Sequence, residues 1–285
     1  MTLQDDLIAW FDVEARDLPW RRDTLPWSVM VSEFMLQQTP VSRVLPIFVA
    51  WMVRWPTPAA LAADPPGEAV RAWGRLGYPR RALRLHEAAT AIVERHGGEV
   101  PSERGALLAL PGVGDYTASA IASFAFGARH PVMDTNVRRV FARAERGVAF
   151  PPKSVTADER ALAESLLPER DAHRWAAATM ELGAVICTAR APRCEACPVA
   201  DRCQWRAAGY PEHEGPPRRG QAWAGTDRQV RGRLMAVLRE ADGPVSRAAL
   251  DAVWDDPVQR DRCLDTLVFD GLVEPLGQDW FALPA

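Results

Sequence analysis

The feature that most restricts how this chain can fold is a cluster of cysteines. Four of its five cysteines lie in one segment, CTARAPRCEACPVADRC, with the spacing C-x6-C-x2-C-x5-C. The segment directly follows an apolar helical stretch, AHRWAAATMELGAVI. Thiols stay reduced inside cells, so cysteines gathered at this density indicate metal ligands or catalytic groups rather than disulfides. The candidate metal ligands are Cys187, Cys194, Cys197 and Cys203.

The spacing of the cysteines bears on the kind of metal centre. Structural zinc sites usually combine two C-x2-C pairs, or a cysteine pair with a histidine pair, separated by ~12 to 20 residues. This segment contains one such pair. Four unequally spaced thiolates in a folded-back loop suit a cubane iron-sulfur cluster, which the spacing favours, and zinc remains the alternative. Cys263, beside Leu264 and Leu267, is expected in the core.

Composition and charge describe an ordinary soluble protein. A length of 285 residues with 48% hydrophobic side chains fits about two domains. No apolar run approaches the ~20 residues of a membrane span, and the acidic start lacks the pattern of a secretory signal. We expect a cytoplasmic monomer. The net charge of −3 gives no global sign of a nucleic-acid partner, so that argument rests on local clusters.

Helical periodicity dominates the chain. Apolar residues recur every three to four positions in VMVSEFMLQQ, ALRLHEAATAIVERH and DTNVRRVFARA, among other stretches, and no convincing strand occurs before residue 210. The fold class is therefore all-α. Residues 211–226, rich in proline and glycine, are expected to form a linker. Residues 227–285 suggest three helices and a short hairpin, a small winged-helix-like unit.

The segment LPGVGDYTASAIASFAFG predicts two helices joined by a tight hairpin. Its glycines allow a close approach of the backbone, and amides at the start of the second helix can bind an anion such as a DNA phosphate. A carboxylate would repel that phosphate, so Asp115 is expected to cap its own helix. A simple helix–helix turn without a ligand is the alternative.

Two carboxyl groups stand out from their surroundings. Glu33 shares a helix face with Val29, Met30 and Leu36, so its pKa is expected to be raised by burial. A glutamate at the edge of that face, reaching water, is the alternative. Asp134 heads another helix, where capping is the simplest role and where the helix dipole favours the anion.

In combination, these segments resemble a known family. S-E-F-M-L-Q-Q-T, L-G-Y at 76–78, L-P-G-V-G-D-Y-T-A, M-D-T-N-V-R-R-V and the four-cysteine loop, in this order, closely resemble the adenine DNA glycosylases of the helix-hairpin-helix superfamily. The resemblance covers about residues 1–210. It implies a six-helix barrel domain at 26–126, a cluster domain built from 1–25 and 127–210, and a [4Fe-4S] cluster on the four cysteines.

The resemblance also implies an activity. Members of this family flip adenine out of double-stranded DNA, where it is mispaired with 8-oxoguanine or guanine, and cleave its N-glycosidic bond. Such chemistry needs one protonated and one ionised carboxyl group, roles that fit Glu33 and Asp134. Tyr116 stands where bifunctional relatives carry a Schiff-base lysine, and Lys153 is the only lysine. We therefore expect a monofunctional enzyme.

The motif positions further imply which residues meet the DNA. The expected contacts are Gln37, Gln38, Thr39, Leu76, Tyr78, Gly112, Val113, Gly114 and Arg138. The stretch RAWGRLGYPRRALR adds arginines around Trp73 and Tyr78, a pattern typical of a phosphate track with a stacking side chain, although burial is the simpler expectation for Trp73. Pro79 replaces a second tyrosine common in the family.

Other functions remain open from the sequence. A thymine or uracil mismatch glycosylase of the same superfamily shares the hairpin, Asp134, Tyr116 and the cysteine loop, but not Glu33 in its Gln-Gln-Thr context. A non-catalytic mismatch-binding protein leaves the two carboxyl groups unexplained, and a redox iron-sulfur protein needs an electron partner that no motif indicates. The tail of about 70 residues is shorter than the family's lesion-reading domain. The tail either supplies phosphate contacts or only packs on the preceding 210 residues; the arginines that could make such contacts are Arg218, Arg219, Arg228, Arg231 and Arg233.

Overall fold

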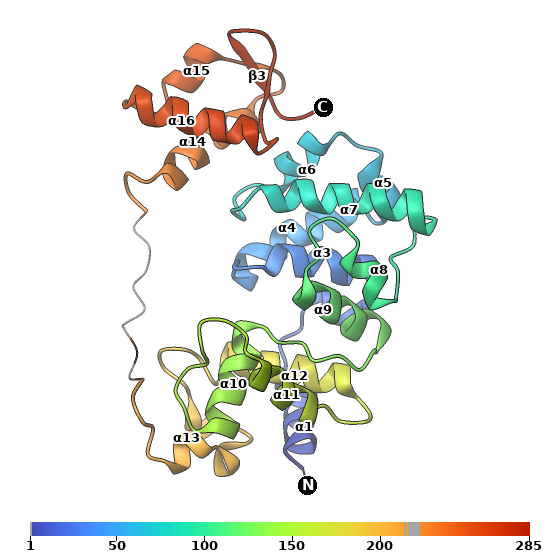
Figure 1. Ribbon diagram of the computed structural model, residues 1–285. Helices are drawn as coiled ribbons and strands as arrows, with labels where there is room; N and C mark the ends of the chain where they lie inside the picture. The colour runs from blue at the N-terminus through green and yellow to red at the C-terminus, as the bar shows by residue number, and fades with distance from the viewer. Residues whose placement is uncertain (1, 214, 216–222) are drawn as a thin grey trace. The chain divides into compact units, whose positions relative to one another are not determined.

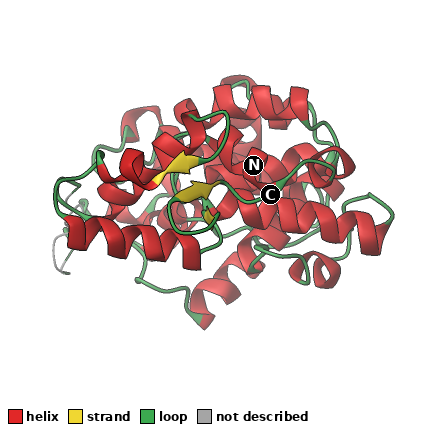
Figure 2. Ribbon diagram, turned by 90° about the horizontal axis from the view of Figure 1, so that it is seen from above, coloured by secondary structure: helices red, strands yellow, loops and turns green. Residues whose placement is uncertain are grey.

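The computed structural model describes residues 2–213, 215 and 223–285, so the expected linker at 211–226 lies partly outside the described residues. Helices dominate, and the three short strands lie near the C-terminus (Figures 1 and 2). None of the described helices has the length and apolar character needed to cross a membrane. The all-α prediction is confirmed.

The chain divides into two compact units, each assembled from separate stretches of sequence. Unit 1 comprises Met1–Val29, Ser102–Leu108 and Val113–Pro217, and unit 2 comprises Met30–Pro101, Ala109–Gly112 and Arg218–Ala285. The helices at 104–108 and 115–126, which the sequence places in the barrel domain, group here with the cluster loop. Helix α3 (Pro26–Leu36) starts in one unit and ends in the other.

Unit 1 contains the cysteine loop and the N-terminal helix. Its helices are α1 (Leu3–Glu14), α2 (Pro19–Arg22), α8 (Arg104–Leu108), α9 (Asp115–Phe126), α10 (Thr135–Arg146), α11 (Ala157–Ser165), α12 (Ala172–Val185), η1 (Cys194–Ala196), η2 (Ala200–Arg202) and α13 (Gln204–Ala207). Capping boxes start α1 at Thr2 and α11 at Thr156. These caps explain why the helices begin where they do.

A buried ion-pair network fixes the segment after α1 to α12. Glu181 is fully buried and accepts hydrogen bonds from Arg16 at 2.7 Å and Arg21 at 2.8 Å. Burial alone would raise the pKa of Glu181, but the two guanidinium groups lower it to about 2. Around it, α1, α10 and α12 pack into one core that includes Leu7, Phe141 and Trp175.

Unit 2 is built around three tryptophans. Its helices are α4 (Val41–Arg54), α5 (Pro58–Ala62), α6 (Pro66–Trp73), α7 (Arg80–His96), α14 (Asp227–Glu240), α15 (Arg247–Asp251) and α16 (Pro257–Phe269). The rings of Trp55 and Trp73 pack edge-on against Trp51, and all three are buried. Burial, the simpler expectation for Trp73, is confirmed.

The C-terminal module, residues 227–285, matches the winged-helix-like prediction. Strands β1 (Val245–Ser246), β2 (Glu274–Pro275) and β3 (Trp280–Ala282) form an antiparallel sheet in the order β1-β3-β2 beside α14, α15 and α16. The sequence missed β1, because two residues are too few for a strand pattern. Cys263 lies in the core of this module, as expected.

Candidate active site and iron-sulfur loop

Asp134 is the N-cap of α10. Its Oδ1 accepts hydrogen bonds from the backbone N–H groups of Asn136 at 2.8 Å and Val137 at 2.7 Å, and its Oδ2 accepts one from Asn136 Nδ2 at 2.8 Å. Burial raises the pKa of Asp134, whereas these donors and Arg139 favour the anion. Both oxygens act as acceptors, which is the pattern of a carboxylate. The structure confirms the capping role.

The support behind Asp134 depends on a glycine. Helix α12 approaches α10 so closely that a Cβ atom at Gly183 would lie 2.7 Å from Asn136 Cβ and 2.8 Å from Asn136 O. On its other side, the Asn136 side-chain oxygen accepts a hydrogen bond from Arg139 at 2.8 Å. Asn136 is therefore held between two elements while it orients the Asp134 carboxylate.

Glu33 lies in the last turns of α3, in unit 2. It is 5% exposed, which agrees with the expected burial and excludes a glutamate that reaches freely into water. Val29 and Met30, one turn earlier on the same face, are also buried. Its apolar setting is therefore as the sequence predicts.

Five of the expected DNA contacts lie in two loops that the structure ties together. Gln37, Gln38 and Thr39 follow α3, and Leu76 and Tyr78 lie between α6 and α7. Thr39 Oγ1 donates a hydrogen bond to the Leu76 carbonyl oxygen at 3.1 Å. Gln38 and Tyr78 both adopt positive φ, 55° and 48°, a conformation costly for residues other than glycine. Strain of this kind is characteristic of functional loops.

Arg81 connects these two loops by hydrogen bonds. It was not predicted as a site residue. Its guanidinium group donates to the carbonyl oxygens of Phe34, Met35, Gln37 and Gly77 and to Thr39 Oγ1, at 2.6 to 3.1 Å. It thereby closes the C-terminal end of α3, where carbonyl groups lack helical partners. Burial lowers the pKa of Arg81 to about 10. An arginine among apolar residues at the start of α7 was the available signal.

The predicted hairpin lies at 109–114, between α8 and α9. Gly112 has a φ of 76°, and a Cβ atom there would lie 2.7 Å from Arg84 Cβ and 2.9 Å from the Phe34 ring, so only glycine fits. Val113 is buried, whereas Gly112 and Gly114 are exposed. Close packing alone explains why position 112 is a glycine, without any need for a ligand. Gly114, in contrast, has open space around it.

The expectation that Asp115 caps α9 is wrong. The N-cap residue is Gly114, and α9 has no side-chain cap among the described residues. Asp115 instead pairs with Arg104 at 2.7 Å and Arg160 at 3.4 Å. Two guanidinium groups on neighbouring helices hold the carboxylate to the side, which a sequence pattern cannot reveal because α11 is distant in the chain.

The four cysteines of the loop converge on one cavity, lined also by Arg143, Ile186, Pro192 and Trp205. Burial, together with the neighbouring thiols Cys187, Cys194 and Cys203, raises the pKa of Cys197 to about 11. Four thiols facing one space fit the corners of an iron-sulfur cluster.

Two buried arginines of α10 organise the start of the cysteine loop. Arg139 donates to the Cys187 carbonyl oxygen at 2.8 Å, and Arg143 donates to Cys187 Sγ at 3.3 Å and to the Thr188 carbonyl oxygen at 2.8 Å. The Arg143 guanidinium also lies over the Trp205 ring. The sequence analysis missed both residues, although their spacing of one helical turn places them on one face of α10.

Comparisons with known proteins agree with this geometry. Residues 31–164 match the family model described as HhH-GPD superfamily base excision DNA repair protein, and residues 187–203 match the iron-sulfur binding domain of endonuclease III. The adenine DNA glycosylases of Mycobacterium tuberculosis and Mycolicibacterium smegmatis are each 55% identical over 98% of this chain, covering 92% and 94% of their own lengths. The chain belongs to the adenine DNA glycosylase family.

A solved structure supports the same fold. The structure of a thermostable thymine-DNA glycosylase aligns with 72% of this chain and 95% of its own, with a TM-score of 0.65 at 28% identity. The match at 187–203 confirms the predicted [4Fe-4S] loop. The matched segment spans all four cysteines of the loop.

Several arginines expected near the DNA have partners within the protein. Arg138 is buried, pairs with Glu159 at 2.9 Å and donates to the carbonyl oxygens of Pro152 and Ser154. In the structure its guanidinium group is therefore used inside the protein. The sequence placed it correctly at the start of α10 but could not show which side of the helix it occupies.

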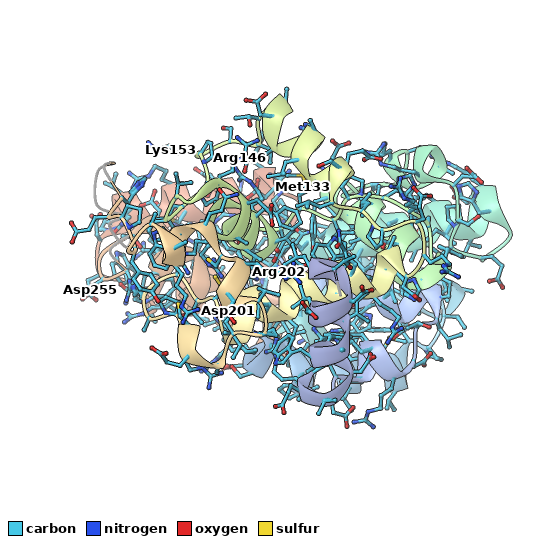
Figure 3. All side chains as sticks on the ribbon, turned by 90° about the horizontal axis from the view of Figure 1, so that it is seen from below. Met133, Arg146, Lys153, Asp201, Arg202 and Asp255 are labelled. Atoms are coloured by element: carbon cyan, nitrogen blue, oxygen red, sulfur yellow. The ribbon has the colours of Figure 1, made fainter. Side chains whose placement is uncertain are left out.

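The arginines around Tyr78 also differ from the expected phosphate track. Arg71 donates to carbonyl groups of the C-terminal module, Arg80 pairs with Asp270, and Arg84 pairs with Glu87. Together with the half-buried Arg81, most of these charges are used within the protein. Arg75 is exposed. The only lysine, Lys153, is exposed in the loop between α10 and α11 (Figure 3).

Proposed function

We propose that this protein removes adenine mispaired with 8-oxoguanine or guanine in double-stranded DNA, as a monomeric, monofunctional glycosylase of base excision repair. The observation that carries the proposal is the extent of the similarity, 55% identity over 98% of the chain, to adenine DNA glycosylases. Thymine or uracil removal is the less favoured alternative, since the sequence identity to the thymine-DNA glycosylase structure is 28%, against 55% to the adenine DNA glycosylases.

The chemistry assigns opposite protonation states to two carboxyl groups. Glu33, buried at the end of α3, carries the proton that the departing adenine needs. Asp134 accepts three N–H groups and remains the anion that stabilises the positive charge on the sugar. Tyr116, in the first turn of α9, occupies the position next to the hairpin where a lysine would otherwise form a covalent adduct.

DNA binding is assigned to the hairpin and the two joined loops. The positive end of the α9 dipole and the exposed Gly112 and Gly114 suit a phosphate, which fixes position without reading sequence. Gln37, Gln38 and Tyr78 are the side chains that enter the helix around the mispair. Unpairing and flipping the base costs a few kcal/mol, which these contacts offset.

Cys187, Cys194, Cys197 and Cys203 would hold the cluster, which would cross-link the loop when bound. The chain's own residues do the remaining work there. Arg139 and Arg143 fix the loop to α10, the helix whose N-terminus carries Asp134.

Base release from four duplexes tests this function. Adenine should be released from A:8-oxoguanine and A:G pairs, and neither thymine from G:T nor uracil from G:U. Glu33→Gln should lower the single-turnover rate by about 100-fold or more, whereas Glu87→Gln, the same change at an exposed site, should not. Thymine release, or normal turnover in Glu33→Gln, would contradict the assignment.

The monofunctional part of the proposal has its own test. The product strand should remain intact until alkali treatment, and borohydride should trap little covalent complex, because the chain offers no motif lysine. Efficient trapping that disappears in Lys153→Ala would show that the enzyme is bifunctional.

A further inference from the structure

The C-terminal module is poorly suited to binding DNA. Residues 227–285 contain eleven acidic side chains against seven arginines, a formal charge of −4. Of the five arginines that the sequence offered as phosphate contacts, Arg218 and Arg219 lie outside the described residues, and the other three have partners in the protein. Arg231 pairs with Asp270, Arg233 lies over the Trp254 ring, and Arg228 lies over the Tyr78 ring. A surface that is net acidic repels the DNA backbone.

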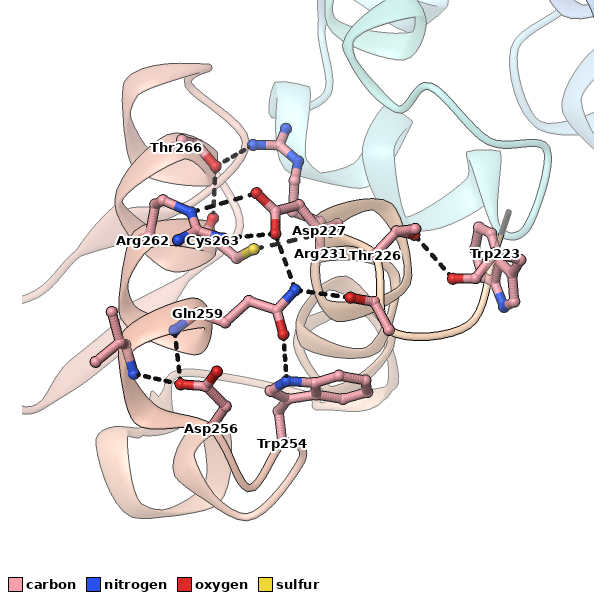
Figure 4. Close-up of polar contacts among 12 residues, drawn as sticks. Trp223, Thr226, Asp227, Arg231, Trp254, Asp256, Gln259, Arg262, Cys263 and Thr266 are labelled. Atoms are coloured by element: carbon pink, nitrogen blue, oxygen red, sulfur yellow. Dashed lines mark hydrogen bonds and ion pairs between the residues drawn. The ribbon is translucent and has the colours of Figure 1, made fainter. Parts of the chain in front are cut away.

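The arginines of helix α16 (Pro257–Phe269) are likewise paired within the module. In helix-turn-helix proteins the second helix of the motif reads bases through its exposed side chains. Here Arg260 pairs with Asp251, and Arg262 pairs with Asp227 of α14. Figure 4 shows Asp227 facing both Arg262 and Gln259, and Gln259 facing Trp254, so this network links α14 to α16. These side chains hold the module together rather than present it to a groove.

The module contacts the 74–79 loop on both of its flanks. On the α6 side, Arg71 donates to the carbonyl oxygens of Arg239 and Ala241 at the end of α14. On the α7 side, Arg80 pairs with Asp270 at 3.2 Å. Both flanking helices of the loop are therefore fastened to the same module, which also packs its last residues against the start of α6.

That last contact is unusually close. Gly67 N–H donates to the Pro284 carbonyl oxygen at 2.8 Å, and a Cβ atom at Gly67 would lie 2.4 Å from that oxygen. The glycine is required for this approach. The C-terminal residues thus pack directly against the backbone of α6. A loosely tethered tail would not make such a contact.

Between the two flanks, the module touches Tyr78 itself. The Arg228 guanidinium lies 5.8 Å from the Tyr78 ring centroid, and its Nη2 donates to the Tyr78 hydroxyl at 3.4 Å. Arg81, from the barrel helices, lies 5.7 Å from the same centroid. Tyr78 therefore has two guanidinium groups near its ring, one from α7 and one from the C-terminal module, and both lie within the range of cation–π attraction.

Tyr78 needs this support because of its conformation. Its φ is 48°, and Gly74 and Gly77 in the same loop also have positive φ, 54° and 84°. Its side chain is 52% exposed, so few packing contacts determine where the ring points. A non-glycine residue in this region persists only when its surroundings hold it there, at a cost of about 1 to 3 kcal/mol.

We propose that the C-terminal module is a positioning element for Tyr78: through Arg228 and the Arg80–Asp270 pair it holds the 74–79 loop in the conformation that enters mispaired DNA. The module thus sets discrimination between mispaired and paired duplexes without reading bases itself. The inference rests on the proposed DNA contact of Tyr78, and it assigns to this chain's short tail a role different from phosphate binding.

Substitution of Arg228 tests the proposal, with Arg233 as the matched control on the same helix. Arg228→Ala in the full chain should weaken binding to an A:8-oxoguanine duplex by about three- to tenfold, the loss of one cation–π contact and its ordering effect. Binding to the fully paired duplex should change less than twofold. Arg233→Ala, whose ring contact lies inside the module, should retain wild-type discrimination.

Three further measurements separate positioning from phosphate contact. Arg228→Lys keeps the charge but not the planar guanidinium group, so it should resemble Arg228→Ala. The slope of log Kd against log salt should stay unchanged, whereas loss of a phosphate contact would reduce it by about 1. In a Tyr78→Ala background, Arg228→Ala should have no further effect, because the two residues act through one contact.

Several outcomes would overturn the proposal. Equal weakening on both duplexes, rescue by lysine, or additivity with Tyr78→Ala would each show that Arg228 binds phosphate directly. Loss of discrimination in Arg233→Ala as well would indicate a general effect on the module's fold, which the thermal midpoint would reveal. Absence of adenine release by the wild-type protein would contradict the proposed function instead, since discrimination is measured by binding alone.

Discussion

Helices α9 and α10 follow one another in the chain, have the same length of 12 residues and belong to the same compact unit, yet their N-termini are built differently. Helix α10 begins at Asp134, whose carboxylate accepts two backbone N–H groups of its first turn. Helix α9 begins at Gly114 and has no side-chain cap within the described residues. The nearest carboxylate, Asp115, is paired with Arg104 and Arg160.

This difference shows how one physical property serves two purposes. The first N–H groups of a helix and its dipole favour an anion at the N-terminus. At α10 the protein supplies that anion through Asp134, and the helix in turn fixes the carboxylate that we propose stabilises the sugar cation. At α9 no described side chain caps the N-terminus. The positive end of this helix is therefore suited to a phosphate of the DNA. Moving or removing a carboxylate at either helix therefore tests the comparison.

The largest expected effect comes from Asp134→Asn. Asparagine also caps a helix and can keep the two backbone hydrogen bonds, but its amide group cannot accept from Asn136 Nδ2, so the thermal midpoint should fall by the equivalent of one lost side-chain hydrogen bond. The charge that stabilises the sugar cation is lost, and single-turnover adenine release should fall by about 100-fold or more. Quenched-flow measurement of base release, with Kd measured in parallel, separates the chemical step from binding.

The pH dependence provides the control for this substitution. Because burial raises the pKa of Asp134, the carboxylate takes up a proton as pH falls through that raised value. The wild-type rate should therefore decline on the acid side, and Asp134→Asn should lack this decline. A rate within tenfold of wild type, or an unchanged acid limb, would mean that Asp134 is only a structural cap.

Gly114→Asp should make α9 resemble α10. A Cβ atom at Gly114 has open space around it, and its φ of −99° suits any residue. The new carboxylate would cap α9 and occupy the phosphate position, so Kd for duplex DNA should rise by about tenfold. The thermal midpoint should stay the same or rise, because glycine is a slightly weaker cap.

Gly114→Ser is the matched control, since serine caps the helix without a charge. It should weaken DNA binding less than aspartate does, by about twofold to threefold. Wild-type affinity in Gly114→Asp, or an equal loss in both variants, would show that phosphate is bound elsewhere.

The sequence predicted a large part of this site and failed at identifiable points. Periodicity, turn residues and cysteine spacing act within short segments, so they located the hairpin, the cap at Asp134 and the cluster loop correctly. Asp115 was assigned wrongly, because its partner Arg160 lies 45 residues away. Arg81 and Arg143 were missed for the same reason: their bonds to loop carbonyl groups depend on tertiary packing, which no local pattern encodes.

Gly183→Ala tests the support of the α10 cap without changing its chemistry. The added methyl group would meet Asn136 at 2.7 to 2.8 Å, so α10 or α12 must shift. We expect a loss of about 1 to 3 kcal/mol in stability and a roughly three- to fivefold slower adenine release, because misplacement of a reacting group raises the barrier. Thermal melting and single-turnover kinetics measure the two effects.

Gly232→Ala is the control for this change, as a helical glycine in α14 whose nearest neighbour would be 3.9 Å away. It should be neutral or stabilising by up to about 1 kcal/mol. If Gly183→Ala loses the expected stability but releases adenine at an unchanged rate, Asn136 does not position Asp134.

The smallest expected effect concerns Asp115→Asn. The side chain is 62% exposed, and its charge opposes an anion at the start of α9 while it occupies Arg104 and Arg160. Its removal should lower Kd for duplex DNA by about two- to threefold, the value of one exposed charge near a helix terminus. The gain should shrink at higher salt, since exposed charges are screened. Asp158→Asn, an exposed acid in the first turn of α11, should leave Kd unchanged. Weaker binding by Asp115→Asn would instead show that its ion pairs are needed to hold the hairpin, so that α9 depends on a carboxylate no less than α10 does.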